Sequence, residues 1–114
     1  MSDCLFCKII VGELPSTKVY EDEQIVAIND LYPLAPVHIL VVPKKHIPSL
    51  NEIAEEDLPM LGHILKITKE LAAEAQIAES GYRVVTNIGK DGAQAVQHLH
   101  FHIMGGKPLG AKLG

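Results

Sequence analysis

The stretch His98-Leu99-His100-Phe101-His102-Ile103-Met104 alternates three histidines with large apolar residues. Successive side chains of a β-strand point to opposite faces of the sheet, so this alternation predicts a strand with all three imidazoles on one face. Leu99, Phe101 and Ile103 then lie on the other face, where we expect the core. Imidazole can act as a nucleophile, an acid or base near neutral pH, or a metal ligand. We therefore expect chemistry on the histidine face; the alternative is three polar side chains on a solvated strand.

The spacing of these histidines also predicts that they have different roles. Histidines two positions apart on a strand lie roughly 6.6 Å from each other and can converge on one zinc ion. His98 and His102 are about 13 Å apart on the same arithmetic, too far for a single ion to bind all three imidazoles comfortably.

Length and composition predict a single globular domain over residues 1–114, since 47% of the residues are hydrophobic and 21% are charged. A net charge of −4, with no basic stripe beyond Lys44-Lys45, argues against a nucleic-acid partner. No apolar run approaches the ~18 residues that span a bilayer, so we expect no membrane partner. Two cysteines, and an N-terminus (Met1 to Cys4) without the regions of a signal peptide, predict a reducing, cytoplasmic setting.

Apolar segments bounded by turn residues predict the other elements. We expect a short helical segment over residues 4–11 and strands over 18–21, 24–28, 37–42 and 81–88, the first two forming a hairpin. One long helix is predicted from Asp57, its N-cap, to about Gln76. Its apolar stripe, which suits core or dimer packing, comprises Leu58, Leu61, Leu65, Thr68, Leu71 and Ala75. His63 on this helix is expected to be structural or exposed.

The loop over residues 87–97 is expected to lie beside the imidazoles, because it joins two strands of a predicted hairpin. Its glycines and small residues let backbone N–H groups approach a ligand, and Asn87 and Gln94 add neutral donors. Such donors suit a phosphoryl group whose charge changes during displacement. A plain turn is the alternative for this loop.

Cys4 and Cys7 form the second constellation. Two thiolates two residues apart are half of a tetrahedral zinc site, whose remaining ligands can be distant histidines. The alternative is a pair of unligated thiols. A redox pair is less favoured, because no strand precedes the motif as in thioredoxin-like proteins.

The histidine stretch matches the His-x-His-x-His-x-x signature of the histidine triad superfamily, and the resemblance extends over nearly the whole chain. Further segments resemble the small nucleotide-binding branch of that superfamily: Phe6, Lys8-Ile9-Ile10, Tyr20-Glu21-Asp22, Pro36-x-His38, Val42-Pro43-Lys44-Lys45-His46, Gly81-Tyr82-Arg83, Asp91-Gly92-x-Gln94 and Gly105-Gly106. The resemblance implies an α+β fold with an antiparallel sheet of about five strands, one long and one short helix, and a two-fold homodimer paired through the helix and a sheet edge.

The same resemblance implies hydrolysis of purine nucleoside phosphoramidates. His100 corresponds to the nucleophile, which attacks the α-phosphorus and forms a nucleotidyl-histidine that water hydrolyses. His102 and His38 correspond to residues that hold the phosphate and supply protons, and Asp30 to the acceptor of the ribose hydroxyls. The apolar slot for a purine, as in an AMP-like ligand, corresponds to Leu5, Phe6, Leu14, Ile28 and Leu31.

In zinc-containing relatives the cysteine pair is completed by two histidines, which correspond to His46 and His98, so the resemblance implies a structural zinc. The chain departs from the pattern at Ala95, where relatives often have a serine that helps to protonate the leaving group; only the backbone N–H remains for phosphate. Alternatives on the same fold are dinucleoside polyphosphate hydrolysis and nucleotidyl transfer. An alternative of another class is a nucleotide-binding interaction module with little turnover.

Overall fold

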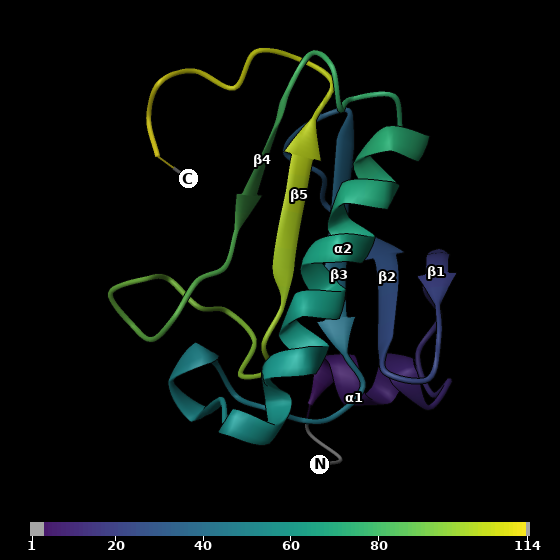
Figure 1. The fold of residues 1–114 in the computed structure, drawn as a ribbon, viewed down its shortest axis with the longest axis vertical. Coiled ribbons are helices and arrows are strands. Elements are labelled where there is room, and N and C mark those ends of the chain that lie inside the picture. The colour runs from purple at the N-terminus through teal and green to yellow at the C-terminus, as the bar shows by residue number, and fades with distance from the viewer. Residues whose placement is uncertain (1–3, 114) are drawn as a thin grey trace.

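The computed structural model describes residues 4–113. The prediction about a signal peptide rests partly on Met1 to Asp3, which lie outside the described residues. The chain folds as a five-stranded antiparallel sheet with the order β1-β2-β3-β5-β4 (Figure 1). The strands are β1 (Lys18–Glu21), β2 (Ile25–Asn29), β3 (Val37–Pro43), β4 (Tyr82–Val85) and β5 (Phe101–Gly105). The helices are α1 (Leu5–Ile10), α2 (Leu58–Glu74) and two short 3₁₀ turns, Leu50–Glu52 and Glu55–Asp57. This confirms the α+β class and the predicted sheet.

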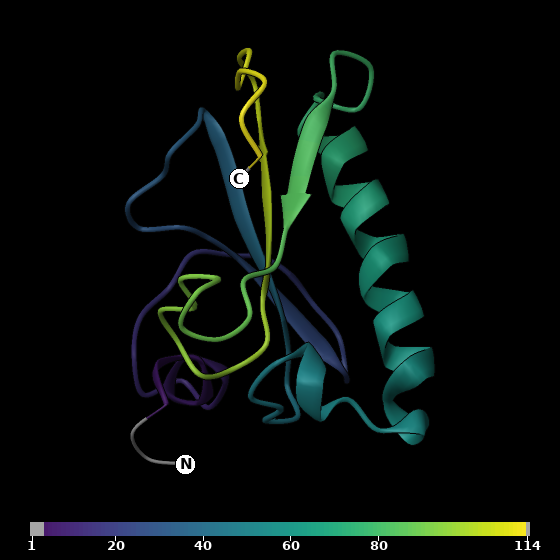
Figure 2. The same ribbon diagram turned by 90° about the vertical axis from the view of Figure 1, so that its left-hand side faces the viewer.

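The two helices lie on opposite faces of the sheet. Figure 2 shows α2 along one face and α1, with the loop that precedes β5, on the other. Side chains of Ile39, Val41 and Ile103 pack under α2 in the larger core cluster. Side chains of Val26, Leu40 and Val42 pack under α1 in a smaller cluster. Strands β2 and β3 therefore each contribute side chains to both clusters, and their apolar runs are continuous for that reason.

The predicted alternation of the histidine stretch is confirmed, but its strand begins later. Leu99, Phe101 and Ile103 lie in the core cluster under α2, so the intervening histidines face the α1 side. The ladder between β3 and β5 starts at the pair Val41 and Phe101, because β3 ends at Pro43, which has no N–H to donate. The N–H of Leu99 donates instead to the carbonyl of Ile47, at 2.7 Å.

The predicted apolar stripe of α2 lies only partly in the core. Thr68 and Leu71 are buried as expected, but Leu58 and Leu65 are 53% and 58% exposed. The buried face consists of Met60, Ile64, Ile67, Thr68, Leu71 and Ala72. The helix carries apolar residues on more than one face, and helical spacing alone cannot tell which face meets the sheet.

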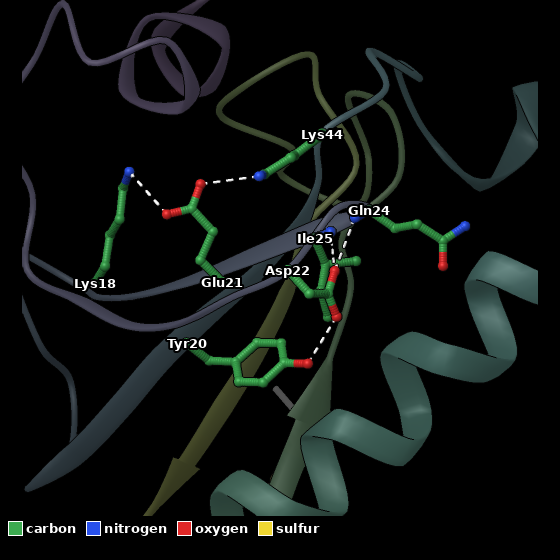
Figure 3. A network of polar contacts seen from close by, with 7 residues as sticks. All are labelled: Lys18, Tyr20, Glu21, Asp22, Gln24, Ile25 and Lys44. Atoms are coloured by element: carbon green, nitrogen blue, oxygen red, sulfur yellow. Dashed lines mark hydrogen bonds and ion pairs between the residues drawn. The ribbon is translucent and has the colours of Figure 1, made fainter.

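Asp22 ties the turn between β1 and β2 to α2. Its carboxylate accepts hydrogen bonds from the Tyr20 hydroxyl at 2.7 Å and from the backbone N–H groups of Gln24 and Ile25 (Figure 3). Nε2 of His63 on α2 lies 2.6 Å from the same carboxylate. Burial alone would raise the pKa of Asp22, but the hydrogen bonds from His63, Tyr20 and the backbone hold it well below its usual value. His63 therefore has a structural role.

Lys44 and Lys45 follow the end of β3, and both form ion pairs. Nζ of Lys44 lies 2.9 Å from the Glu21 carboxylate, a contact drawn in Figure 3. Nζ of Lys45 lies 2.7 Å from the Asp57 carboxylate. Asp57 directly precedes α2, as predicted. Its side chain accepts a hydrogen bond from the N–H of Ala54 and does not cap the helix. Among residues 4–113 no helix is long and apolar enough to cross a membrane.

Candidate functional site

The neighbouring backbone fixes the tautomer of the His100 imidazole. Its Nδ1 lies 2.7 Å from the backbone carbonyl of His98. A carbonyl oxygen can only accept, so Nδ1 carries the proton and Nε2 keeps its lone pair. His100 is buried, and this burial lowers the pKa of the imidazole from its ordinary value. His100 is therefore neutral at pH 7 with a free nitrogen, which is the state a nucleophile needs.

His38 and His102 form a hydrogen-bonded relay. The N–H of Leu34 donates to Nδ1 of His38 at 3.1 Å, so the proton of His38 sits on Nε2. That nitrogen lies 2.9 Å from Nδ1 of His102 and 3.5 Å from the Asp30 carboxylate. His102 therefore accepts at Nδ1 and holds its own proton on Nε2. Burial, with smaller contributions from His100 and His38, lowers the pKa of His102 to about 4.

This relay is not arranged as a metal site. Donor atoms of Asp30, His38 and His102 lie within 4.8 Å of one another, as in a three-ligand centre. A cation at Nε2 of His38 would have to displace the proton to Nδ1, where the N–H of Leu34 already points. Two donors would then face each other, so proton donation is the better assignment for this group.

A cavity of about 450 Å³ opens beside the histidines. All five residues expected for the purine slot line it: Leu5, Phe6, Leu14, Ile28 and Leu31. Asp30, Ala95, His100 and His102 line it as well. Sequence reasoning missed further lining residues, namely Ile9, Pro15, Ser16, Asn29, Tyr32, Leu40 and Val96. Ile9 could have been predicted, because it lies one helical turn after Leu5 and Phe6 on α1. The other missed residues reach the cavity through loop geometry and strand pairing.

Phe6 joins α1 to the histidines. Its ring packs edge-on against His100, with centroids 4.9 Å apart, and against His98, at 5.8 Å. Phe6 also lies in the core cluster beneath α1 and lines the cavity. The short helix thus sets one wall of the cavity relative to His100.

The loop over residues 87–97 uses its amides to hold its own shape. The Asn87 side chain donates to the Gly92 carbonyl at 2.8 Å, and the Gln94 side chain donates to the carbonyls of Pro48 and Val96. A Cβ at Gly92 would clash with the Ile88 carbonyl oxygen, so this bend requires glycine. Ala95 reaches the cavity, whereas the amide donors of Asn87 and Gln94 are engaged by the backbone.

The second constellation is the Cys–His cluster, which consists of Cys4, Cys7, His46 and His98. Sγ of Cys4 lies 3.3 Å from Nδ1 of His98, Sγ of Cys7 lies 3.3 Å from Nδ1 of His46, and the two Nδ1 atoms are 3.1 Å apart. Zn–N bonds of about 2.0 Å and Zn–S bonds of about 2.3 Å place tetrahedral ligands at similar separations.

The surroundings of the cluster fit a metal ion. Nε2 of His98 donates to the Pro43 carbonyl at 2.8 Å, which leaves the lone pair of Nδ1 facing the thiols. Burial and the neighbouring Cys4 raise the pKa of the Cys7 thiol, so a cation between the sulfur atoms is needed to hold both as thiolates. Cys4, Cys7, His46 and His98 can therefore hold a metal ion.

The fold, the triad and the cavity beside it define a histidine triad protein, and comparison with known proteins agrees. Residues 3–112 match the family described as "Scavenger mRNA decapping enzyme C-term binding". The structure superimposes on a HIT family hydrolase from Clostridium thermocellum with a TM-score of 0.95 and 48% identity, covering 99% of this chain and 98% of that chain. The chain belongs to the histidine triad superfamily.

Two curated relatives are similar to this chain over nearly their whole length. A HIT-like protein of Chlamydia pneumoniae is 50% identical over 94% of this chain and 96% of that protein. The purine nucleoside phosphoramidase of Escherichia coli K12 is 40% identical over 97% of this chain and 93% of that protein. The chain is thus a nucleotide hydrolase of the histidine triad superfamily, similar along its length to a phosphoramidase.

Proposed function

We propose that the protein hydrolyses the P–N bond of purine nucleoside 5′-phosphoramidates. The observation that carries this proposal is His100, a buried and neutral imidazole whose Nδ1 proton is fixed by the His98 carbonyl. Its free Nε2 belongs to a residue that lines a cavity with an apolar slot and a carboxylate. A nucleophile beside a slot of that composition suits a nucleotide.

The reaction then proceeds by two displacements. Nε2 of His100 attacks the α-phosphorus, the P–N bond breaks, and the nitrogen leaves as an amine after taking a proton. Because Ala95 offers no hydroxyl, that proton comes from water. Nε2–H of His102, oriented through His38, donates to a phosphoryl oxygen whose negative charge grows in the transition state. Water next attacks the nucleotidyl-histidine, releasing the nucleoside monophosphate and regenerating His100.

The remaining site residues position the nucleotide. The Asp30 carboxylate accepts hydrogen bonds from the ribose hydroxyls, and the apolar slot of Leu5, Phe6, Leu14, Ile28 and Leu31 takes the purine. We assign Asn87 and Gln94 to hold the loop, so that its backbone N–H groups, including that of Ala95, face the phosphate.

We further propose that the Cys–His cluster binds a structural zinc ion. Two thiolates and two imidazoles complete a tetrahedral set and leave no position for water, so the ion supports the fold. It ties α1, through Cys4 and Cys7, to His98 beside the nucleophile. We also propose a cytoplasmic homodimer, in which the exposed stripe of Leu58 and Leu65 on α2 and the free edge of β4 meet a second copy.

The decisive experiment compares turnover of an adenosine phosphoramidate with that of a diadenosine polyphosphate. We expect the phosphoramidate to react faster, and His100→Ala to lose on the order of 10³-fold in turnover while still binding AMP. His63→Gln, which changes a histidine outside the cavity, is the control. Faster cleavage of the polyphosphate would indicate the alternative hydrolase, and AMP binding without turnover would indicate an interaction module.

A further inference from the structure

The loop between β2 and β3 exposes an unusual amount of apolar surface. Leu31, Tyr32 and Leu34 are 78%, 83% and 72% exposed. Large apolar side chains gathered on a surface commonly mark a place where a ligand or partner docks. Leu31 and Tyr32 line the cavity beside the triad, whereas Leu34 does not. The exposed surface therefore continues into the candidate site at Tyr32.

Tyr32 is delivered to this position by a stiff turn. The Asp30 carboxylate accepts the N–H of Tyr32 at 2.8 Å through one oxygen, and its other oxygen lies 3.5 Å from Nε2 of His38. Pro33 follows directly, which restricts the backbone of Tyr32 to extended conformations. The turn is thus anchored on the Asp30 carboxylate, which we propose to bind ribose. Tyr32, which carries the phenol ring, is two positions beyond Asp30 in the chain.

We propose that Tyr32 is a base-binding residue that covers the purine base of the bound nucleotide. This rests on the proposed function, because it assigns a residue to the same site. The slot residues are aliphatic apart from Phe6, whose ring already packs against His98 and His100. Tyr32 supplies a second, free aromatic face at the open side of the cavity. Its ring can stack on or against the base while its hydroxyl stays in water.

The test separates the base from the ribose phosphate. We expect Tyr32→Ala to weaken AMP binding by about tenfold, the size of a modest base–aromatic stack, and Tyr32→Phe to stay within about twofold of the wild type. Binding of ribose 5-phosphate, measured by competition, should be equal in all three proteins. Leu34→Ala is the matched control, because it removes an equally exposed side chain of the same loop that does not line the cavity.

Tyrosine fluorescence gives a second readout. The chain has no tryptophan and three tyrosines, of which Tyr20 and Tyr82 are half-buried, so Tyr32 should dominate quenching by iodide. We expect AMP to protect the wild type from iodide, ribose 5-phosphate to protect it little, and Tyr32→Phe to lose this accessible component.

Equal losses for AMP and ribose 5-phosphate would mean that Tyr32→Ala disturbs the turn at Asp30 and would overturn the assignment. Unchanged AMP affinity in Tyr32→Ala would overturn it while leaving the phosphoramidase proposal intact. If the wild-type chain does not bind AMP, the proposed function and this assignment are both wrong.

Discussion

Replacing His38 tests the relay that we derive for the active site. His38 donates through Nε2 to Nδ1 of His102 at 2.9 Å and thereby keeps the proton of His102 on the nitrogen proposed to face phosphate. In His38→Ala, His102 can place its proton on either nitrogen. The donor to the phosphoryl oxygen is then lost for part of the population. A hydrogen bond to a charged group is worth about 1.5–3 kcal/mol, so we expect kcat/KM to fall about 10- to 150-fold.

The assay for this prediction is hydrolysis of an adenosine phosphoramidate, with ¹⁵N shifts of the His102 ring to report its protonation. His38→Gln is the matched variant, because its amide places an N–H donor near the position of Nε2, and it should recover part of the activity. The N–H of Leu34, which loses its acceptor, lies on an exposed loop where water replaces the bond. Activity of His38→Ala within about twofold of the wild type, or a wild-type His102 unprotonated at Nε2, would refute the reasoning.

The other predictions concern zinc, ribose and acid stability. The protein should purify with about one zinc ion per chain, and a chelator should lower its Tm, with activity falling only as folding does; activity that follows metal added to an already folded protein would contradict a structural ion. Asp30→Ala should weaken AMP binding by about 1.5–3 kcal/mol and binding of the dideoxyribose analogue much less, and equal losses would place Asp30 outside the ribose site. Because the folded pKa of Asp22 lies below its unfolded value, its stabilisation is complete above the unfolded pKa and is lost as pH falls toward the folded one. Urea unfolding of Asp22→Asn should therefore show a deficit of about 1–3 kcal/mol at pH 7 that narrows in acid, and a deficit independent of pH would contradict the linkage.

The parts of the site that lie on regular elements were predictable from sequence. Alternation in the histidine stretch identified both its faces, because a strand has a period of two and Leu99 and Phe101 could only be buried on one side. The grouping of the Cys–His cluster and of the residues expected for a purine slot followed from family resemblance, since their members come from segments far apart in the chain. The structure brings the members of each group together.

The parts that depend on packing were not predictable. Helical spacing put Leu58 and Leu65 on the stripe expected to serve core or dimer packing, but the sheet contacts a neighbouring face of α2. The amides of Asn87 and Gln94 suited phosphate by composition, but their nearest acceptors are carbonyls of their own loop and of Pro48. The partnership of His63 with Asp22 spans 41 positions and has no local signal.

The alternation of side chains over residues 98–104 makes this segment sensitive to the insertion or deletion of single residues. A substitution changes one contact, but an added or deleted residue turns every side chain beyond it to the opposite face. The imidazoles would then lie under α2, and Phe101 and Ile103 would enter the cavity. The core, the Cys–His cluster and the position of His100 would all be lost at once. Libraries of fixed length should yield folded members across this segment, whereas single-residue insertions and deletions there should yield none.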